Sequence, residues 1–564
     1  MSAASPTEIR FRAMRLFAIL AMFFAMAAPA TQAQAQAAAA PPLSAAVAAD
    51  PILKAMRAEL DRSKSQLKME NLGAPYYIEY RVSDVNRYEV DTAFGPVQQK
   101  EKIHGRSLRV VVRVGDYKLD SYYGPGLGVV DFAPIDDDPI ALRRQLWLAT
   151  DSAYKRAAEA LASKKAALAQ YAAGQPFDDF AKAPAIESIG PVLKMDFSLD
   201  PWAATLEKAT NLYRTNLKIQ SVQGSFHLQL TNEYYVNSEG TSIRHGYPIY
   251  TLELSANAQA TDGMRLGRTP FYAETSADAL PSPETFLAKA TRALTSLQEL
   301  MDARIVEEDY NGPVLFSSDA AVDVIETLIG DNVLGIRPHL GDSSRTTGSF
   351  ASNYKSRVLP TFLTVVDDPT MKTFAGKNLA GSYEIDEEGV RATAVPVIQD
   401  GMLTNYLMGR MPIRDIPDSN GHGRAGPGQA PNPDIGVLVV KPKDPVSPED
   451  LKKKLIELCK QQDKSYGYYV ETMAGMNPRL LYRVYVNDGH QELVRGGTFN
   501  ELDTRALRNN LIAAGNDPEV SNRGGYVPTT VISPSILFDE LEIKRTDRKD
   551  AKLPEYPAPD LAAR

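Results

Sequence analysis

Residues 226–240 read FHLQLTNEYYVNSEG, and residues 250–263 read YTLELSANAQATDG. Apolar and polar residues roughly alternate in both stretches, which is the period of a β-strand with one buried face. The segment Asn237–Gly240 between them has the composition of a turn. The pattern therefore predicts an antiparallel strand pair within an all-β segment at about 226–275.

Helices with clear starting signals flank this segment. Asp50-Pro51 opens the first, the run Asp136 to Pro139 opens the second, and Ser282-Pro283 opens the third. An acid or serine at the N-cap followed by proline suits a first helical turn. The three aspartates of the second start could bind a cation, but negative charge at a helix N-terminus is the interpretation that we favour. Further strands are expected at 76–82 and 108–114.

From about residue 305 the pattern changes to short strands separated by glycine turns. A strand is expected at 312–316, and Ser318 is expected to cap a helix over 319–329. Another helix is expected at 447–462. The other expected strands are 362–367, 392–398, 403–407, 437–440, 482–486 and 536–543, with hairpin turns at Asp400-Gly401 and Asp488-Gly489. The sequence thus predicts an α+β fold: an N-terminal α/β domain, then a mostly antiparallel β C-terminal domain with a few helices.

The first residues have the three parts of a secretory signal peptide. Three arginines at 10, 12 and 15 precede an uncharged apolar run over 16–28, and A-x-A cleavage patterns follow at 33–37. The run is shorter than the ~20 residues that a helix needs to cross a bilayer. An uncleaved anchor is the alternative. We expect a cleaved signal peptide, no stable membrane anchor, and a periplasmic or secreted protein.

Length and composition restrict the classes of function. The expected segments are a signal peptide (1–35), a disordered lead-in (36–48), an N-terminal domain (49–225), a middle β segment with a bridging helix (226–304), a C-terminal domain (305–545) and a flexible tail (546–564). The net charge of the whole chain is −8. The expected signal contributes +2, so the mature chain is more negative still, which argues against nucleic acid as a partner. The single cysteine, Cys459, is expected to be buried and can form no internal disulfide.

One glycine-rich loop is the most site-like segment. Residues 421–426 read GHGRAG, but a proline follows, so the string opens no helix and is not a dinucleotide motif. Glycines allow close backbone approach to a ligand, and Arg424 could bind a carboxylate. We therefore take His422 and Arg424 as candidate substrate-binding residues. A flexible exposed loop is the equal alternative.

A series of motifs in the second half resembles the TldD/PmbA family. They are LTVVDDPT (363–370), EIDEEG (384–389), VIQDGMLTNYLMGR (397–410), SNGHGRA (419–425), VYVNDGHQELVRGGTF (484–499) and NNLIAAGNDPEV (509–520), and NSEG at 237–240 is similar to the family's N-S-x-G turn. Catalytic members are metallopeptidases. The resemblance implies a Zn-like divalent ion held by H-E-x-x-x-H on a helix and by a cysteine in a glycine-rich C-terminal loop.

This sequence departs from that pattern at each metal ligand. The matching helix reads IETLIG at 325–330, so the two histidine positions hold Ile325 and Gly330. The matching loop, SNRGGY at 521–526, has no cysteine. Glu326 alone remains as a relic of the motif, and a hydrogen-bonded or solvated surface glutamate is the simpler interpretation. We therefore expect no metal and no other cofactor.

The resemblance leaves two functions open. The first is an exported, metal-free protein of the PmbA/TldE type, a pseudoenzyme that binds peptide or pairs as a homo- or heterodimer with a metal-bearing TldD-type subunit. The alternative is an active metallopeptidase that degrades unstructured peptides through a non-standard site. A structural envelope protein without a ligand is a third possibility.

Overall fold

Four long strands dominate the N-terminal half of the computed structural model, which describes residues 44–68, 73–122, 128–170, 177–215, 218–546 and 552–556. They are β1 (Tyr77–Ala93), β2 (Val97–Arg113), β5 (Ile219–Asn237) and β6 (Ser242–Gln259), each antiparallel to its neighbour. The sheet order is β3-β2-β1-β5-β6-β4, and β7 and β8 also pair with β6. The minor strands are β3 (Val129–Phe132), β4 (Glu187–Ile189), β7 (Arg265–Arg268) and β8 (Phe271–Glu274).

Two tight turns connect the four long strands in antiparallel pairs. The expected turn between β5 and β6 is confirmed: Asn237 Oδ1 accepts hydrogen bonds from the backbone N–H groups of Glu239 and Thr241, both at 3.1 Å. Between β1 and β2 the chain reverses at Phe94 and Gly95, whose φ values are 51° and 109°. Each of these two strands has 17 residues, more than twice the length expected from the sequence. The prediction was too short because polar residues in the middle of each strand interrupt the apolar pattern.

Helices cover only one face of this sheet. They are α2 (Pro51–Gln66), α3 (Pro139–Leu168), α4 (Asp200–Asn211) and α5 (Pro283–Asp302). The three predicted N-caps are confirmed, since Asp50, Asp138 and Ser282 each accept a backbone hydrogen bond in the first helical turn. Even-numbered strand residues such as Tyr80 and Leu228 pack against these helices. We call this the outer face, and the opposite one, formed by odd-numbered residues of β1, β5 and β6, the inner face.

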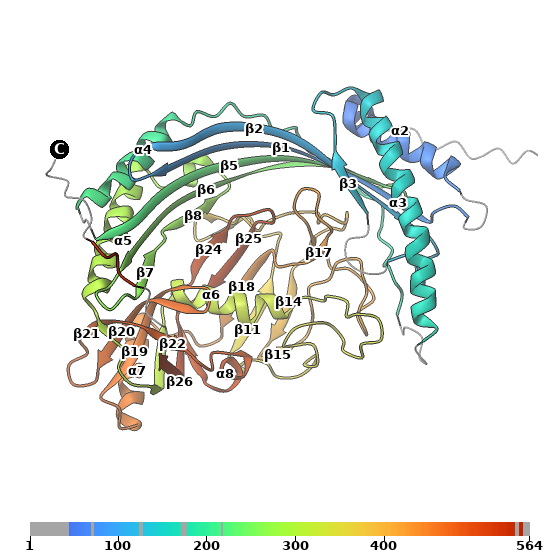
Figure 1. Ribbon diagram of the computed structural model, residues 1–564. Helices are drawn as coiled ribbons and strands as arrows, with labels where there is room; N and C mark the ends of the chain where they lie inside the picture. The colour runs from blue at the N-terminus through green and yellow to red at the C-terminus, as the bar shows by residue number, and fades with distance from the viewer. Residues whose placement is uncertain are drawn as a thin grey trace, which may run out of the picture. The chain divides into compact units, whose positions relative to one another are not determined.

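The C-terminal residues lie on the inner side of the curved sheet (Figure 1). They form two larger sheets, in the orders β22-β26-β10-β19-β20-β21-β9 and β15-β14-β11-β18-β25-β24. The strands of the first are β9 (Arg304–Ile305), β10 (Tyr310–Phe316), β19 (Tyr466–Ala474), β20 (Asn477–Tyr485), β21 (Gln491–Arg495), β22 (Gly497–Phe499) and β26 (Ile536–Arg545), with β23 (Leu511–Ala514) paired to β26. Those of the second are β11 (Leu363–Asp367), β14 (Val395–Gln399), β15 (Met402–Leu403), β18 (Val437–Pro442), β24 (Glu519–Arg523) and β25 (Thr529–Ser533). Two two-stranded sheets pair β12 (Thr373–Phe374) with β13 (Lys377–Asn378) and β16 (Gly423–Arg424) with β17 (Asn432–Pro433).

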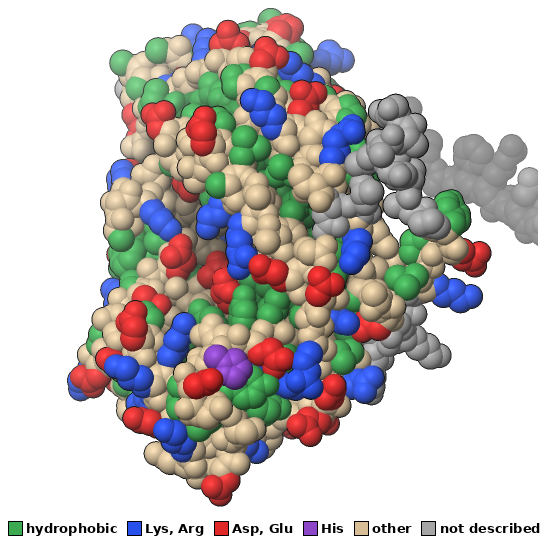
Figure 2. All heavy atoms as spheres, turned by 90° about the vertical axis from the view of Figure 1, so that its left-hand side faces the viewer, with side chains coloured by type: hydrophobic (Ala, Val, Ile, Leu, Met, Phe, Trp, Pro, Cys, Tyr) green, Lys and Arg blue, Asp and Glu red, His purple; other side chains and the backbone are tan. Residues whose placement is uncertain are grey.

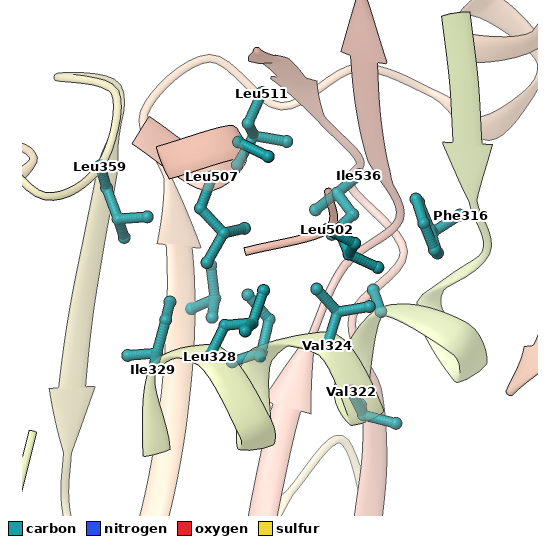
Figure 3. Packing of buried hydrophobic residues seen from close by; sticks show 14 of the residues in the cluster. Phe316, Val322, Val324, Leu328, Ile329, Leu359, Leu502, Leu507, Leu511 and Ile536 are labelled. Carbon is teal, nitrogen blue, oxygen red and sulfur yellow. The ribbon is translucent and has the colours of Figure 1, made fainter. Parts of the chain in front are cut away.

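Helix α6 (Ser318–Leu328) lies in the core of the C-terminal part. Figure 3 shows Val324, Leu328 and Ile329 directed toward Leu502 and Leu507. The other C-terminal helices are α7 (Pro448–Gln461) and α8 (Thr504–Asn509). Cys459 of α7 is buried in a separate apolar cluster, as expected, and burial raises the pKa of its thiol to about 11.

The α+β class is confirmed, with four local differences. Ser317, rather than Ser318, caps α6. The expected strand 403–407 ends at Leu403, because the chain then turns to make isolated contacts. The boundary expected at residue 225 falls inside β5, which pairs along its length with β1. Part of the expected lead-in forms helix α1 (Ala45–Ala49). The predicted signal peptide lies outside the described residues. Among the described residues no helix is long and apolar enough to span a membrane.

Candidate functional site

The inner face of the first sheet is polar along its middle. Arg87 and Asp91 of β1, His227 and Gln229 of β5, and Glu253 of β6 all carry partly exposed side chains there. The C-terminal part contacts this sheet near the β5–β6 turn and near β7. It also reaches the middle of the face, where Tyr526 Oη lies 3.5 Å from Arg87 Nη2. The polar side chains that stay partly exposed beside this contact are suited to a hydrophilic ligand. Figure 2 shows the molecule from the side, with a hollow that has both acidic and basic side chains at its rim.

A pocket of about 320 Å³ lies on this inner face. Its lining includes Asp91, Ser225, His227 and Glu253. His227 Nε2 lies 3.3 Å from Asp91 Oδ1, and this hydrogen bond raises the pKa of the imidazole. The pocket therefore combines acidic groups with an imidazole that stays protonated to higher pH than an isolated histidine.

The region of the metal motif is closed by an arginine. Asp323 and Glu326 lie one turn apart on α6, and Arg523 approaches them from the end of β24. The Arg523 Nε donates to Glu326 Oε2 at 2.9 Å, and its Nη2 pairs with Asp323 Oδ1. These groups are only partly exposed, with side-chain accessibilities of 30% for Arg523, 13% for Asp323 and 30% for Glu326. The two segments that resemble the family's metal-binding segments, α6 and residues 521–526, are therefore in contact.

The residues present here do not fit the family's metal ion. Ile325 is fully buried in the C-terminal core, and Gly330, also buried, has no side chain to act as a ligand. A guanidinium group lies against the two carboxylates, so a cation is already supplied by the chain. Among the described residues no group of three or more His, Cys, Asp or Glu side chains is arranged to hold a metal ion.

The other two predicted site residues are buried and paired. His422 Nε2 lies 3.1 Å from Asp367 Oδ1. The Arg424 Nε donates to Glu387 Oε2 at 3.0 Å, and the guanidinium lies 3.9 Å from the ring centre of Tyr383. No hydrogen bond or ion pair in the described part of the chain joins either residue to Glu326. The loop is thus ordered by internal partners, which differs from the flexible exposed loop given as the alternative.

A network of buried charges near the β5–β6 turn joins the two halves, and the sequence did not reveal it. Arg410 is completely buried; its Nη2 donates to Glu239 Oε1 at 2.7 Å. Arg81 of β1 donates to the Gln429 carbonyl oxygen at 2.7 Å. Burial raises the pKa of Glu233, which shares this part of the inner face, to about 7. The only sequence signal for this network is the alternation of charged residues in β1 and β5, and that alternation is equally typical of a sheet face exposed to solvent.

This arrangement defines a class of protein: a curved antiparallel sheet with helices outside, and a two-sheet C-terminal part on its polar inner side. Residues 309–545 match the family described as the PmbA/TldA metallopeptidase C-terminal domain. The C-terminal part of the chain thus matches a model of the TldD/PmbA family, as the sequence motifs predicted. A comparison with curated proteins found no match.

Three solved structures share the fold. One is described as a candidate modulator of a DNA gyrase from Thermotoga maritima MSB8; it is 16% identical, covers 86% of this chain and 100% of its own, and has a TM-score of 0.56. TldE from Thermococcus kodakarensis is 13% identical, covers 87% of this chain and 100% of its own, and has a TM-score of 0.56. A third, described as a candidate modulator of DNA gyrase from Bacteroides thetaiotaomicron VPI-5482, is 13% identical, covers 87% and 98%, and has a TM-score of 0.53. These likenesses concern the fold.

Proposed function

We propose that the chain is an exported, metal-free TldD/PmbA-type protein that binds extended peptide segments on the inner face of its first sheet. The observation that carries the proposal is the Arg523 guanidinium between Asp323 and Glu326. It neutralises the carboxylates of the motif helix without a metal ion, while Ile325 is committed to the core. The scaffold of a peptidase is retained and its catalytic ion is replaced by a side chain.

Two features support a peptide as the ligand. The inner face offers donors and acceptors at alternate positions over three adjacent strands, which suits the repeated polar groups of an extended backbone. The pocket of about 320 Å³ on the same face can accept one side chain. In addition, β24 is an edge strand of its sheet, and an edge can receive a further strand.

The test combines metal content, cleavage and binding on the purified protein. We expect no stoichiometric zinc or iron, no chelator-sensitive cleavage of unstructured peptides, and measurable binding of a fluorescent unstructured peptide. Gln229→Trp, in the middle of the inner face, should weaken binding at least tenfold. Gln220→Trp is the matched control, because this glutamine is exposed at the start of the same strand. Stoichiometric metal together with chelator-sensitive cleavage would refute the proposal and favour the active metallopeptidase.

Export and partnership are further parts of the proposal. N-terminal sequencing of the protein recovered from periplasm and medium should give a start after residue 35 or 37; retention of the first residues would contradict a cleaved signal. The expected partner is a metal-bearing TldD-type subunit, in a heterodimer, or a second copy of the chain, in a homodimer. Co-expression with such a subunit, followed by mass measurement, should give a stable complex.

A further inference from the structure

The outward side of α3 carries apolar residues that nothing covers within the described chain. Ile140, Trp147 and Leu148 are 76%, 46% and 50% exposed. Exposure of a tryptophan side chain on a helix is unfavourable in free energy, because burial of apolar surface is favourable. The buried side of the same helix packs against α2 and against the outer face of the sheet. The exposed stripe is therefore available for contact with another protein surface.

The charges of this stripe are arranged symmetrically. Arg144 and Asp151 lie on the same side of the helix as Trp147 and Leu148, at i, i+3, i+4 and i+7. Both pairs are centred on the peptide bond between residues 147 and 148, as are Ile140 and Lys155. Two copies of α3 packed antiparallel about a two-fold axis at this point would bring each Arg144 opposite the other Asp151. Trp147 would meet Leu148, and Ile140 would meet the aliphatic stem of Lys155.

The charges of one chain are compatible with that contact. Within the described chain Arg144 has no ion-pair partner. Asp151 pairs only with Lys155 on its own helix, at 2.6 Å, and both are exposed. An additional cation opposite Asp151 would therefore be favourable, and each Arg144 would gain a carboxylate. A stripe that complements itself when rotated by 180° is the pattern expected of an isologous interface.

We propose that a second copy of this chain docks on the outward stripe of α3, giving a two-fold dimer through antiparallel α3 helices. The inference rests on the partnership that the proposed function includes. It names the surface involved, the outward stripe of α3, and the partner, a second copy of the chain. A self-complementary row of one cation, two apolar side chains and one anion favours a copy of the same chain over a peptide or a membrane. The contact involves one helix from each chain, so the dimer should be weak, with dissociation in the micromolar range.

The decisive experiment is a charge reversal with a swap. Sedimentation equilibrium of the purified protein over about 1–100 µM should show a monomer–dimer equilibrium. Arg144→Asp alone and Asp151→Arg alone place like charges opposite each other, and each should weaken the dimer at least tenfold. The double variant Arg144→Asp/Asp151→Arg restores opposite charges and should return the affinity to within about threefold of the starting value. An equimolar mixture of the two single variants should also associate, because each then meets its complement.

Two controls separate this contact from loss of folding. Lys165→Asp makes the same change in charge on the same helix beyond the stripe, at an exposed position, and should leave the dimer intact. The protein has two tryptophans, so Trp202→Phe leaves Trp147 as the reporter, whose emission should shift to shorter wavelength with concentration. A monomer at all concentrations overturns the inference, and so does a dimer unaffected by both single reversals. Peptide binding is measured separately and decides only the proposed function.

Discussion

Replacement of Arg523 by methionine tests the closed motif region most directly. Methionine keeps most of the length and removes the charge. Exposed ion pairs contribute about 0.2–1 kcal/mol, whereas breaking a fully buried pair costs about 3–5 kcal/mol. Asp323 and Glu326 have side-chain accessibilities of 13% and 30%, between these limits. The expected loss in the free energy of unfolding for Arg523→Met is therefore about 1–2 kcal/mol at pH 7.5.

The loss should depend on pH in a defined direction. Burial and the neighbouring Asp323 raise the pKa of Asp319, and Arg523 opposes that rise. Without Arg523, the native pKa of Asp319 therefore rises further above its value in the unfolded chain. The native variant then binds more protons than its unfolded state, and its stability rises as the pH falls. Urea unfolding followed by circular dichroism should show the deficit of Arg523→Met shrinking between pH 7.5 and pH 5.

A double-mutant cycle isolates the interaction. In the background Asp323→Asn/Glu326→Gln the carboxylates are absent, so Arg523→Met should cost less than about 0.5 kcal/mol. Equal losses in both backgrounds would show that the arginine acts through packing alone and would refute the reasoning. A deficit that grows toward pH 5 would refute it as well.

Three other substitutions test other parts of the structure. Arg410→Met should lower the free energy of unfolding by about 3–5 kcal/mol because it leaves Glu239 buried without its cation. In a Glu239→Gln background, urea unfolding should show a smaller loss for the same substitution. Burial raises the pKa of Glu233 to about 7, so the native state holds a proton that the unfolded state has released, and stability falls as the pH rises from about 5 to 8. Glu233→Gln should match the native chain at pH 5 and exceed it by about 2–3 kcal/mol at pH 8, in urea unfolding at both pH values. Gly381→Ala would place a Cβ 1.9 Å from a backbone carbonyl oxygen and should cost at least about 3 kcal/mol, whereas Gly105→Ala, with nothing within 4 Å, should be nearly neutral in thermal unfolding.

Local signals in the sequence predicted the helix starts and turns well. Asp50, Asp138 and Ser282 cap their helices as expected, because capping depends on residues within one turn. The Asp400-Gly401 hairpin is also confirmed: it joins β14 to β15, and both residues have positive φ. Such features need no knowledge of distant segments.

Long-range features could not be read in the same way. The alternation in β5 predicted a strand with one polar face, but it could not reveal that this face lies toward the C-terminal part of the chain. Arg523 was recognised only as a residue in a loop that lacks the family's cysteine. Its partners, Asp323 and Glu326, lie 200 and 197 residues earlier in the chain. An ion pair between such distant segments leaves no local pattern.

The two-sided character of β1, β5 and β6 restricts how these strands can change in length. Each successive residue points to the opposite face, so deletion of one residue would turn the apolar set toward the inner face and the charged set toward the helices beyond that point. Removal of two neighbouring residues would keep both faces correct and merely shorten the ribbon. Natural length variation within these strands should therefore occur in steps of two or be absorbed by bulges such as the one near Asp91.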